Sequence, residues 1–270
     1  MSLVSTDWLY NNIDKVKIFD SSWHLPNENR NAFEEYRKGH IQGSIFFDID
    51  KYSDKKSDLP HMLPSKEEWE LFMSSLGVSN NDIIVIYDDS HLISSCRCWY
   101  TFLYFGHNQD SVFVLDGGLK KWKEENRETV KSITNISKSK YFATENKKLV
   151  KNKIEIDQNI LEKKFKVLDA RSKKRFEGKE AEKRKGLRSG SIPGSYCLPF
   201  RQLINDDNTF KKKDEIRLEF MSIINLEEND IVFSCGSGIT ASVLALAYSL
   251  INNKYSPTVY DGSWSEFGKE

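Results

Sequence analysis

Short apolar runs alternate with longer amphipathic stretches along most of the chain. The runs are rich in β-branched residues, which is typical of strands buried inside a parallel sheet. They predict strands over Val16–Phe19, Ile83–Tyr87, Val112–Leu115, Val167–Leu168, Ile231–Phe233 and Thr258–Tyr260. Stretches between them, such as Glu67–Leu76 and Ala241–Ile251, have helical spacing. Alternating strands and helices predict an α/β fold with helices on both faces of the sheet.

Four sequence blocks occur twice, in the same order. KIFDSSW, GHIQGSIFFDID, DIIVIYDDS and FVLDGGLKKW are followed later by KVLDARS, GSIPGSYCLPF, DIVFSCGSG and TVYDGSWSEF. Equivalent residues are separated by 149, 151, 147 and 145 positions, and they are Asp20 and Asp169, Gly43 and Gly194, Asp88 and Cys235, and Asp116 and Asp261. A period of this length is too long for a solenoid unit, so each copy is expected to be a whole domain.

The duplication agrees with the length of 270 residues, which suggests about two domains. We place the first domain at residues 1–126 and the second at residues 154–270. Residues 127–153 are polar and rich in Lys, Ser, Asn and Thr, and we interpret them as a linker that runs over the surface. Each domain should hold a mostly parallel sheet flanked by helices.

The overall charge excludes some classes of protein. Forty basic and 40 acidic residues give a formal net charge of zero, which argues against a strongly basic nucleic-acid-binding protein. No apolar run reaches the roughly 18 residues of a membrane span. The N-terminal sequence lacks the features of a secretory signal, so we expect a cytoplasmic protein whose four cysteines are free thiols. A monomer is the default expectation for two complementary domains.

The stretch DIVFSCGSGITASVLALAYSL contains the sharpest chemical signal. A predicted strand ends at Ser234, Cys235 follows, and a helix is predicted to start near Thr240. Backbone N–H groups converge at such a strand-to-helix loop, and the positive end of the helix dipole stabilises negative charge on sulfur. Gly236 and Gly238 allow the tight loop that this arrangement requires. Cys235 is therefore the candidate nucleophile.

Comparison of the two copies makes this assignment sharper. The residue equivalent to Cys235 in the first copy is Asp88, which cannot act as a thiol nucleophile. The first domain is therefore interpreted as a non-catalytic copy. Cys96 and Cys98 are expected at the start of a helix after Ser94, and Cys197 is expected in the core. Two cysteines without a second Cys or His pair do not make a zinc site, so no metal and no cofactor are expected.

The chain resembles the tandem-rhodanese sulfurtransferases, and within them the subgroup that takes sulfur from 3-mercaptopyruvate. The loop CGSGIT at positions 235–240 matches the signature of that subgroup, and GHIQGSIFFDID, DLPHMLP and DGSW are supporting motifs. The resemblance covers nearly the whole chain and implies two rhodanese-like α/β domains. It also implies that a thiolate attacks the substrate sulfur, that pyruvate leaves, and that a persulfide remains on the protein.

The resemblance assigns a role to each matching residue. Cys235 would be the nucleophile, Ser237 with His61 and Asp50 would assist proton transfer, and Arg175 with Arg184 would hold the substrate carboxylate and carbonyl. The loop itself would consist of Gly236, Ser237, Gly238, Ile239 and Thr240. Arginine suits this task because its planar guanidinium binds a carboxylate through two donors. The implied acceptors are a small thiol, a thioredoxin-like protein or cyanide.

Three other functions remain possible at this point. A thiosulfate sulfurtransferase would share the fold, but basic residues are expected inside its Cys loop, whereas Gly236, Ser237 and Gly238 carry no charge. A phosphatase of this fold would need Arg at the sixth residue after the cysteine, where this chain has Ala241. The third is a non-enzymatic sulfur carrier or binding module, and the intact Cys235 argues against it.

Overall fold

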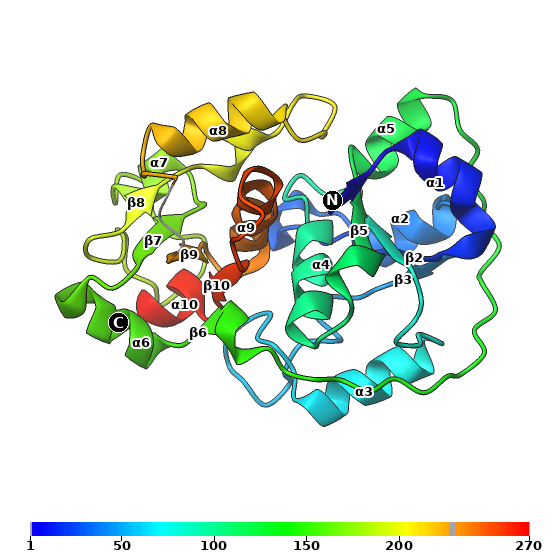
Figure 1. The fold of residues 1–270 in the computed structure, drawn as a ribbon, viewed down its shortest axis with the longest axis horizontal. Helices are drawn as coiled ribbons and strands as arrows, with labels where there is room; N and C mark the ends of the chain where they lie inside the picture. The colour runs from blue at the N-terminus through cyan, green and yellow to red at the C-terminus, as the bar shows by residue number, and fades with distance from the viewer. Residues whose placement is uncertain (1, 227–229, 270) are drawn as a thin grey trace. The chain divides into compact units, whose positions relative to one another are not determined.

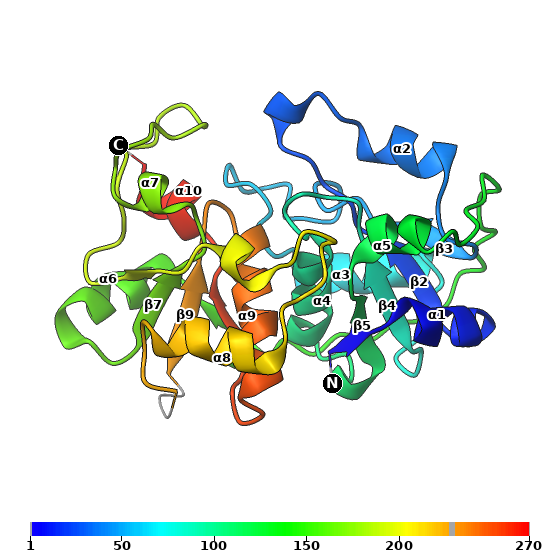
Figure 2. The same cartoon turned by 90° about the horizontal axis from the view of Figure 1, so that it is seen from above.

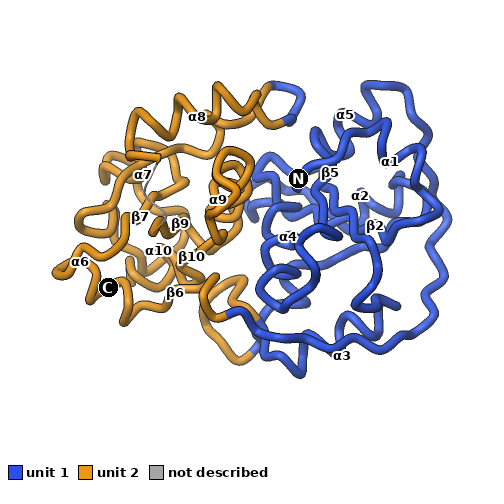
Figure 3. The backbone as a smooth tube through the Cα atoms, viewed as in Figure 1, with its two compact units in different colours: residues 1–55, 64–146, 206–209 blue, residues 56–63, 147–205, 210–270 orange. Residues whose placement is uncertain are grey.

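The computed structural model describes residues 2–226 and 230–269. The chain forms two compact units, drawn in blue and orange in Figure 3. Unit 1 comprises residues 1–55, 64–146 and 206–209, and unit 2 comprises residues 56–63, 147–205 and 210–270. Each unit is thus built mainly from one sequence copy. Residues 56–63 of the first copy group with unit 2, and residues 206–209 of the second copy group with unit 1.

Unit 1 contains a five-stranded parallel sheet (Figure 1). In spatial order its strands are β1 (Leu3–Val4), β5 (Val112–Leu115), β4 (Ile84–Tyr87), β2 (Lys17–Asp20) and β3 (Ser44–Phe46). Its helices are α1 (Thr6–Asn12), α2 (Ala32–Lys38), α3 (Lys66–Ser75), α4 (Ser95–Tyr104) and α5 (Gly118–Glu124). Leu9 of α1 and Trp122 of α5 pack on one face of the sheet with Val85. On the other face, Phe102 of α4 contacts Phe19 of β2 and Trp69 of α3.

Unit 2 repeats this topology (Figure 2). Its strand order is β6 (Val150–Lys151), β10 (Thr258–Tyr260), β9 (Ile231–Ser234), β7 (Lys166–Asp169) and β8 (Tyr196–Cys197). Its helices are α6 (Lys153–Glu162), α7 (Lys173–Phe176), α8 (Lys213–Met221), α9 (Ile239–Ile251) and α10 (Ser263–Phe267). Ile156 of α6 and Trp264 of α10 pack on one face with Val232. Phe220 of α8 and Tyr248 of α9 pack with Phe233 of β9.

Five short 3-10 helices complete the described elements. They are η1 (Ile13–Lys15), η2 (Pro26–Glu28), η3 (Gln109–Ser111), η4 (Lys147–Leu149) and η5 (Phe200–Leu203).

The predicted fold class is confirmed, because both units hold a parallel sheet with helices on its two faces. All six predicted strands are present, with ends that move by one residue at most. The strands β1, β3, β6 and β8 were not predicted, because they are short and only partly buried, so their sequences contain no long continuous apolar run. Each of these lies at the edge of its sheet, where pairing with a neighbour rather than local pattern defines the strand.

The stretch expected to be a linker is divided between the units. Residues 127–146 group with unit 1, and residues 147–153 contribute η4, β6 and the first residue of α6 to unit 2. Backbone hydrogen bonds tie the first part down: the amide of Val130 donates to the His40 carbonyl at 2.8 Å, and that of Thr144 donates to the Phe105 carbonyl at 3.0 Å. Such partners for polar backbone explain why a stretch with few apolar residues stays ordered against a domain.

The described helices include none that is long and apolar enough to cross a lipid bilayer. Within residues 2–226 and 230–269, no group of three or more His, Cys, Asp or Glu side chains is arranged to hold a metal ion.

Candidate active site

Cys235 stands directly after β9 and four residues before the start of α9. Its residue is 1% exposed, and its Sγ accepts a hydrogen bond from the Gly238 amide at 3.1 Å. Gly238 has φ +83°, a left-handed conformation that costs glycine little and a residue with a Cβ more. Ile239 and Thr240 follow as the first, buried residues of α9. The loop therefore presents a backbone donor and a helix N-terminus to the sulfur.

The start of α10 holds this loop in place. The Cys235 amide donates to Ser263 Oγ at 3.2 Å, and the Cys235 carbonyl accepts the Trp264 amide at 2.9 Å. The Gly236 carbonyl accepts both the amide of Ser265, at 2.9 Å, and its hydroxyl, at 2.5 Å. The DGSW block singled out in the sequence thus fixes the backbone around the thiol.

His61, Ser237 and Arg184 form a hydrogen-bonded chain beside the loop. His61 Nδ1 lies 2.9 Å from Ser237 Oγ, and Arg184 Nη2 donates to the same Oγ at 3.5 Å. Because a guanidinium can only donate, the Ser237 hydroxyl accepts from Arg184, and its own hydrogen is left for another acceptor. His61 is 3% exposed and Ser237 is 6% exposed. The arrangement can pass a proton between a bound group and the imidazole.

His61 reaches this site because its segment joins unit 2. Residues 56–63 belong to the first sequence copy, and the sequence places His61 in the first domain, but the structure groups them with unit 2. The Leu63 amide donates to the Asp261 carboxylate at 2.8 Å, which anchors the segment next to the DGSW block. His61 itself has φ +61°, a conformation in which histidine occurs more often than most residues.

Arg184 and Arg175 both point their guanidinium groups at the loop residues. Arg184 Nη1 donates to Ser265 Oγ at 2.7 Å, in addition to its contact with Ser237. Arg175 belongs to α7, and its Nη2 lies 3.6 Å from the position that a Cβ on Gly236 would occupy. The two cations predicted from the sequence are therefore brought together around the Cys235 loop.

A buried chain of alternating charges supports Arg175, and sequence reasoning missed it. Asp169 Oδ2 accepts Arg171 Nη2 at 2.6 Å, Arg171 Nη1 donates to Glu182 Oε1 at 2.7 Å, and Arg175 Nη2 donates to Glu182 Oε2 at 2.6 Å. Burial opposes the charge on Arg171, but its hydrogen bonds to Asp169 and the charges of Asp169 and Glu182 outweigh that effect and raise its pKa. The signal available in the sequence was Arg171 itself, two residues after the end of a buried strand, where the first copy has Ser22.

The structure places Asp50 in unit 1, after β3. Its carboxylate accepts a hydrogen bond from Trp23 Nε1 at 2.8 Å, and the residue is exposed. The other predicted site residues, including His61, all belong to unit 2. The catalytic role of Asp50 remains a prediction.

The equivalent loop of unit 1 is filled by a carboxylate. Asp88 follows β4 and accepts the amides of Ser90, at 2.9 Å, and Ser95, at 2.8 Å. Burial raises the pKa of Asp88, although the hydrogen bonds from Ser95 and Ser90 oppose this. The backbone donors of this loop are thus occupied by the protein's own side chain.

The remaining three cysteines all have thiols whose pKa is raised. Cys96 and Cys98 lie in α4, as expected, and burial raises the pKa of both thiols well above the ordinary value. Cys197, in β8, is only half-buried rather than a core residue. Burial, together with the charge of Asp169, raises the pKa of Cys197 to about 11. These three thiols stay protonated near neutral pH.

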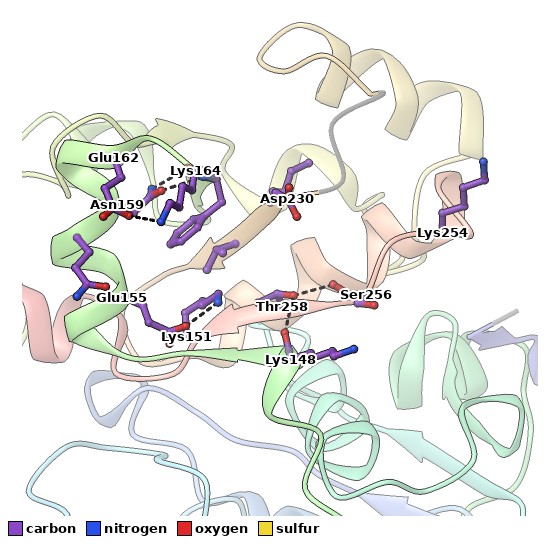
Figure 4. Close-up of a pocket in the computed structure, with 14 residues that line it drawn as sticks. Lys148, Lys151, Glu155, Asn159, Glu162, Lys164, Asp230, Lys254, Ser256 and Thr258 are labelled. Carbon is purple, nitrogen blue, oxygen red and sulfur yellow. Dashed lines mark hydrogen bonds and ion pairs between the residues drawn. The ribbon is translucent and has the colours of Figure 1, made fainter.

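A cavity of about 660 Å³ lies elsewhere in unit 2 (Figure 4). It opens at the start of β9 and β10, whereas Cys235 follows the end of β9. Two of its lysines are paired with its acids, Lys151 with Glu155 at 2.7 Å and Lys164 with Glu162 at 2.7 Å. None of the residues that the sequence assigns to the active site lines this cavity.

Comparisons with known proteins agree with the duplicated fold. The family model of the rhodanese-like domain matches this sequence at residues 5–125 and 152–270. Thiosulfate/3-mercaptopyruvate sulfurtransferase 2 of Arabidopsis thaliana is 37% identical over 98% of this chain and 83% of its own length. The 3-mercaptopyruvate sulfurtransferase of Escherichia coli K12 is 34% identical, over 98% of this chain and 94% of its own length.

A solved structure gives the same result. The crystal structure of SseA from Escherichia coli, described as a 3-mercaptopyruvate sulfotransferase with the rhodanese fold, superposes with a TM-score of 0.87. It is 32% identical in sequence, and the match covers 98% of this chain and 100% of that chain. The chain therefore belongs to the rhodanese family and carries two copies of the rhodanese-like domain in tandem.

Proposed function

We propose that this protein is a sulfurtransferase that moves the sulfur of 3-mercaptopyruvate to a thiol or to cyanide through a persulfide on Cys235. The observation that carries the proposal is the Cys235 loop, in which the sulfur accepts the Gly238 amide at the start of α9. Arg184 donates to Ser237 of this loop, and Arg175 lies next to Gly236. The name of the relative from Escherichia coli supports the same donor, and that of the relative from Arabidopsis thaliana gives thiosulfate as well as 3-mercaptopyruvate.

The first half-reaction balances without an external oxidant or reductant. The Cys235 thiolate attacks the substrate sulfur, a sulfur–sulfur bond forms, and the carbon–sulfur bond breaks. Its electron pair goes to the departing carbon as the enolate of pyruvate, which takes up a proton to give pyruvate. Arg184 and Arg175 stabilise the negative charge that develops on the pyruvate oxygen and hold the carboxylate. The Ser237–His61 pair moves the proton.

The second half-reaction returns Cys235 to a thiol. A small thiol, a thioredoxin-like protein or cyanide takes the outer sulfur of the persulfide. The acceptor attacks this outer sulfur, the sulfur–sulfur bond breaks, and Cys235 leaves as a thiolate. Because Cys235 has to stay a free thiol between turnovers, we place the protein in a reducing compartment such as the cytoplasm. All four of its cysteines are free thiols, which supports this assignment.

The choice of donor follows from the charges near the sulfur. Thiosulfate is a compact dianion and would be bound best by cations inside the Cys loop, but Gly236, Ser237 and Gly238 are neutral. The arginines come instead from outside the loop, where they suit the carboxylate and carbonyl of an α-keto acid. Steady-state kinetics with both donors test this choice, and a higher kcat/KM for thiosulfate would reverse it.

Mass spectrometry tests the intermediate directly. The protein incubated with 3-mercaptopyruvate and no acceptor should gain one sulfur on the peptide that contains Cys235, with release of one pyruvate. Cys235→Ser should abolish both signals and keep the fold, because the replacement is nearly isosteric. Cys197→Ser is the matched control, since it removes another thiol of unit 2, and it should keep both signals. A wild-type protein that gains no sulfur would favour a binding module over an enzyme.

A further inference from the structure

Glu182 has a buried carboxylate, although it lies in a highly charged stretch whose sequence predicts exposure to solvent. It lies within KKRFEGKEAEKRKGLR, where Ala181 and Lys183 on either side are exposed, yet its own side chain is only 2% exposed. A buried carboxylate is costly unless donors satisfy it. Both Glu182 oxygens are satisfied by arginines, Oε1 by Arg171 at 2.7 Å and Oε2 by Arg175 at 2.6 Å.

We propose that Glu182 is a positioning residue that sets the orientation of Arg175 toward the substrate carboxylate. The inference rests on the proposed function, because it concerns how one of the two substrate-binding cations is held. Glu182 acts through Arg175 and is not itself expected to touch the substrate.

The geometry leaves Arg175 able to bind a ligand while it is held. Arg175 meets Glu182 with the Nε and Nη2 edge of its guanidinium, at 3.3 Å and 2.6 Å. A guanidinium has five N–H groups, so Nη1 and the second hydrogen of Nη2 stay available for another acceptor. Nη2 lies 3.6 Å from the Cβ position of Gly236, the residue after Cys235. Glu182 therefore holds Arg175 with Nη2, one of its partly available donors, next to the reactive loop.

Glu182 can serve as an anchor because its other partner is rigid. The side chain of Arg171 is 1% exposed, and it donates to Asp169 and to the Gly190 carbonyl, the latter at 2.8 Å. Its guanidinium also lies over the Trp264 ring, 4.4 Å from the ring centroid. These three contacts hold Arg171 in place, and Glu182 links Arg175, whose side chain is 23% exposed, to this fixed arginine.

The duplication separates this role from a general requirement of the fold. Asp20 of unit 1 is the equivalent of Asp169, but the residue two positions later is Ser22 rather than Arg171. Ser22 satisfies Asp20 with its hydroxyl at 2.6 Å, and the unit 1 sheet forms in the same strand order. The fold thus tolerates a buried Asp here without the arginine chain. The row of charged side chains Asp169, Arg171, Glu182 and Arg175 occurs in the unit that carries Cys235, as expected if it serves the active site.

Kinetics of Glu182→Gln test the proposal. The replacement keeps the size and one acceptor oxygen but removes the charge that holds Arg175. We expect the KM for 3-mercaptopyruvate and the inhibition constant of pyruvate to rise on the order of 10-fold, with kcat changed much less. Glu177→Gln is the matched control, because it removes a carboxylate of the same stretch whose lysine partners are exposed, and it should leave both constants unchanged.

A second comparison shows whether Glu182 works through Arg175. Arg175→Ala alone should raise KM, and adding Glu182→Gln to it should raise KM no further. If Glu182→Gln unfolds, Glu182→Asp keeps the charge and supports the same comparison, with a smaller rise in KM. An unchanged KM in a folded Glu182 variant, or a full additional loss in the double variant, would overturn the inference. A wild-type protein that forms no persulfide from 3-mercaptopyruvate would overturn the proposed function as well.

Discussion

Asp88 and Cys235 occupy the same place in the two units. Each is the first residue after the central strand β4 or β9, and the carbonyl of each accepts an amide at 2.9 Å, from Leu119 in unit 1 and from Trp264 in unit 2. Their side chains also do equivalent things, because both accept backbone N–H groups of the loop that follows. One position therefore carries a fixed carboxyl group in unit 1 and the candidate nucleophilic sulfur in unit 2.

Asp88→Ala should destabilise the protein without changing the chemistry. The replacement leaves the amides of Ser90 and Ser95 without their acceptor, which should lower the free energy of unfolding by about 1–3 kcal/mol. Chemical denaturation measures this loss, and kcat should stay at the wild-type value. Asp89→Ala is the control, because Asp89 makes only partly exposed ion pairs, with Arg30 and Lys123, worth about 0–1 kcal/mol. Equal losses in both variants would contradict the capping role.

Asp20 should make the stability of the protein depend on pH. Burial raises its pKa from 3.8 to about 7, against the hydrogen bonds from Ser22. The folded state therefore keeps a proton that the unfolded chain releases from about pH 4, so this contribution to stability is complete below pH 4 and is lost as the pH rises through 7. Asp20→Asn does not titrate and should gain about 2–3 kcal/mol relative to wild type between pH 5 and pH 8.

Denaturation at the two pH values checks this expectation. The exposed Asp14 provides the control, because Asp14→Asn should follow the wild-type pH profile. A constant difference between Asp20→Asn and wild type across this range would show that Asp20 does not hold a proton in the folded state.

His61 and Ser237 should act as one unit. Their side chains meet at 2.9 Å, so removal of either one breaks the same route for the proton. Ser237→Ala and His61→Gln should each lower kcat on the order of 100-fold, and the double variant should lose little more. Pre-steady-state pyruvate release measures the step. Losses that multiply in the double variant would mean that the two residues act separately.

Ser265 should support Arg184. Its hydroxyl accepts Arg184 Nη1 at 2.7 Å and donates to the Gly236 carbonyl at 2.5 Å, so it links the cation to the Cys loop. Arg184→Ala should lower kcat/KM for 3-mercaptopyruvate by an amount that corresponds to a loss of about 2 kcal/mol or more in transition-state stabilisation. For Ser265→Ala the corresponding loss should be about 1 kcal/mol. Ser189→Ala removes a hydroxyl from the exposed surface and should have no effect. Wild-type kinetics in Arg184→Ala would remove this residue from the substrate site.

The sites that could be predicted are those with a local signal. The Cys235 loop combines a strand, a Gly-x-Gly turn and a helix within neighbouring residues, and its pattern survives any arrangement of the rest of the chain. Glu182 has no such signal, because a glutamate among many charged residues is usually solvated. Only its contacts with Arg171 and Arg175 distinguish Glu182 from Glu177, which lies in the same charged stretch and pairs with the exposed Lys173.

The sequence by itself determined the duplicated α/β architecture, the central strands and the contrast between Asp88 and Cys235, because each depends on residues close together in the chain or on a simple repeat. The tertiary structure decided which segments complete each unit. In the structure, residues 56–63, which include His61, belong to unit 2, and two-residue strands β1, β6 and β8 lie at the sheet edges. Such features depend on hydrogen bonds and ion pairs between residues far apart in the chain, and no periodicity of hydrophobic positions records them.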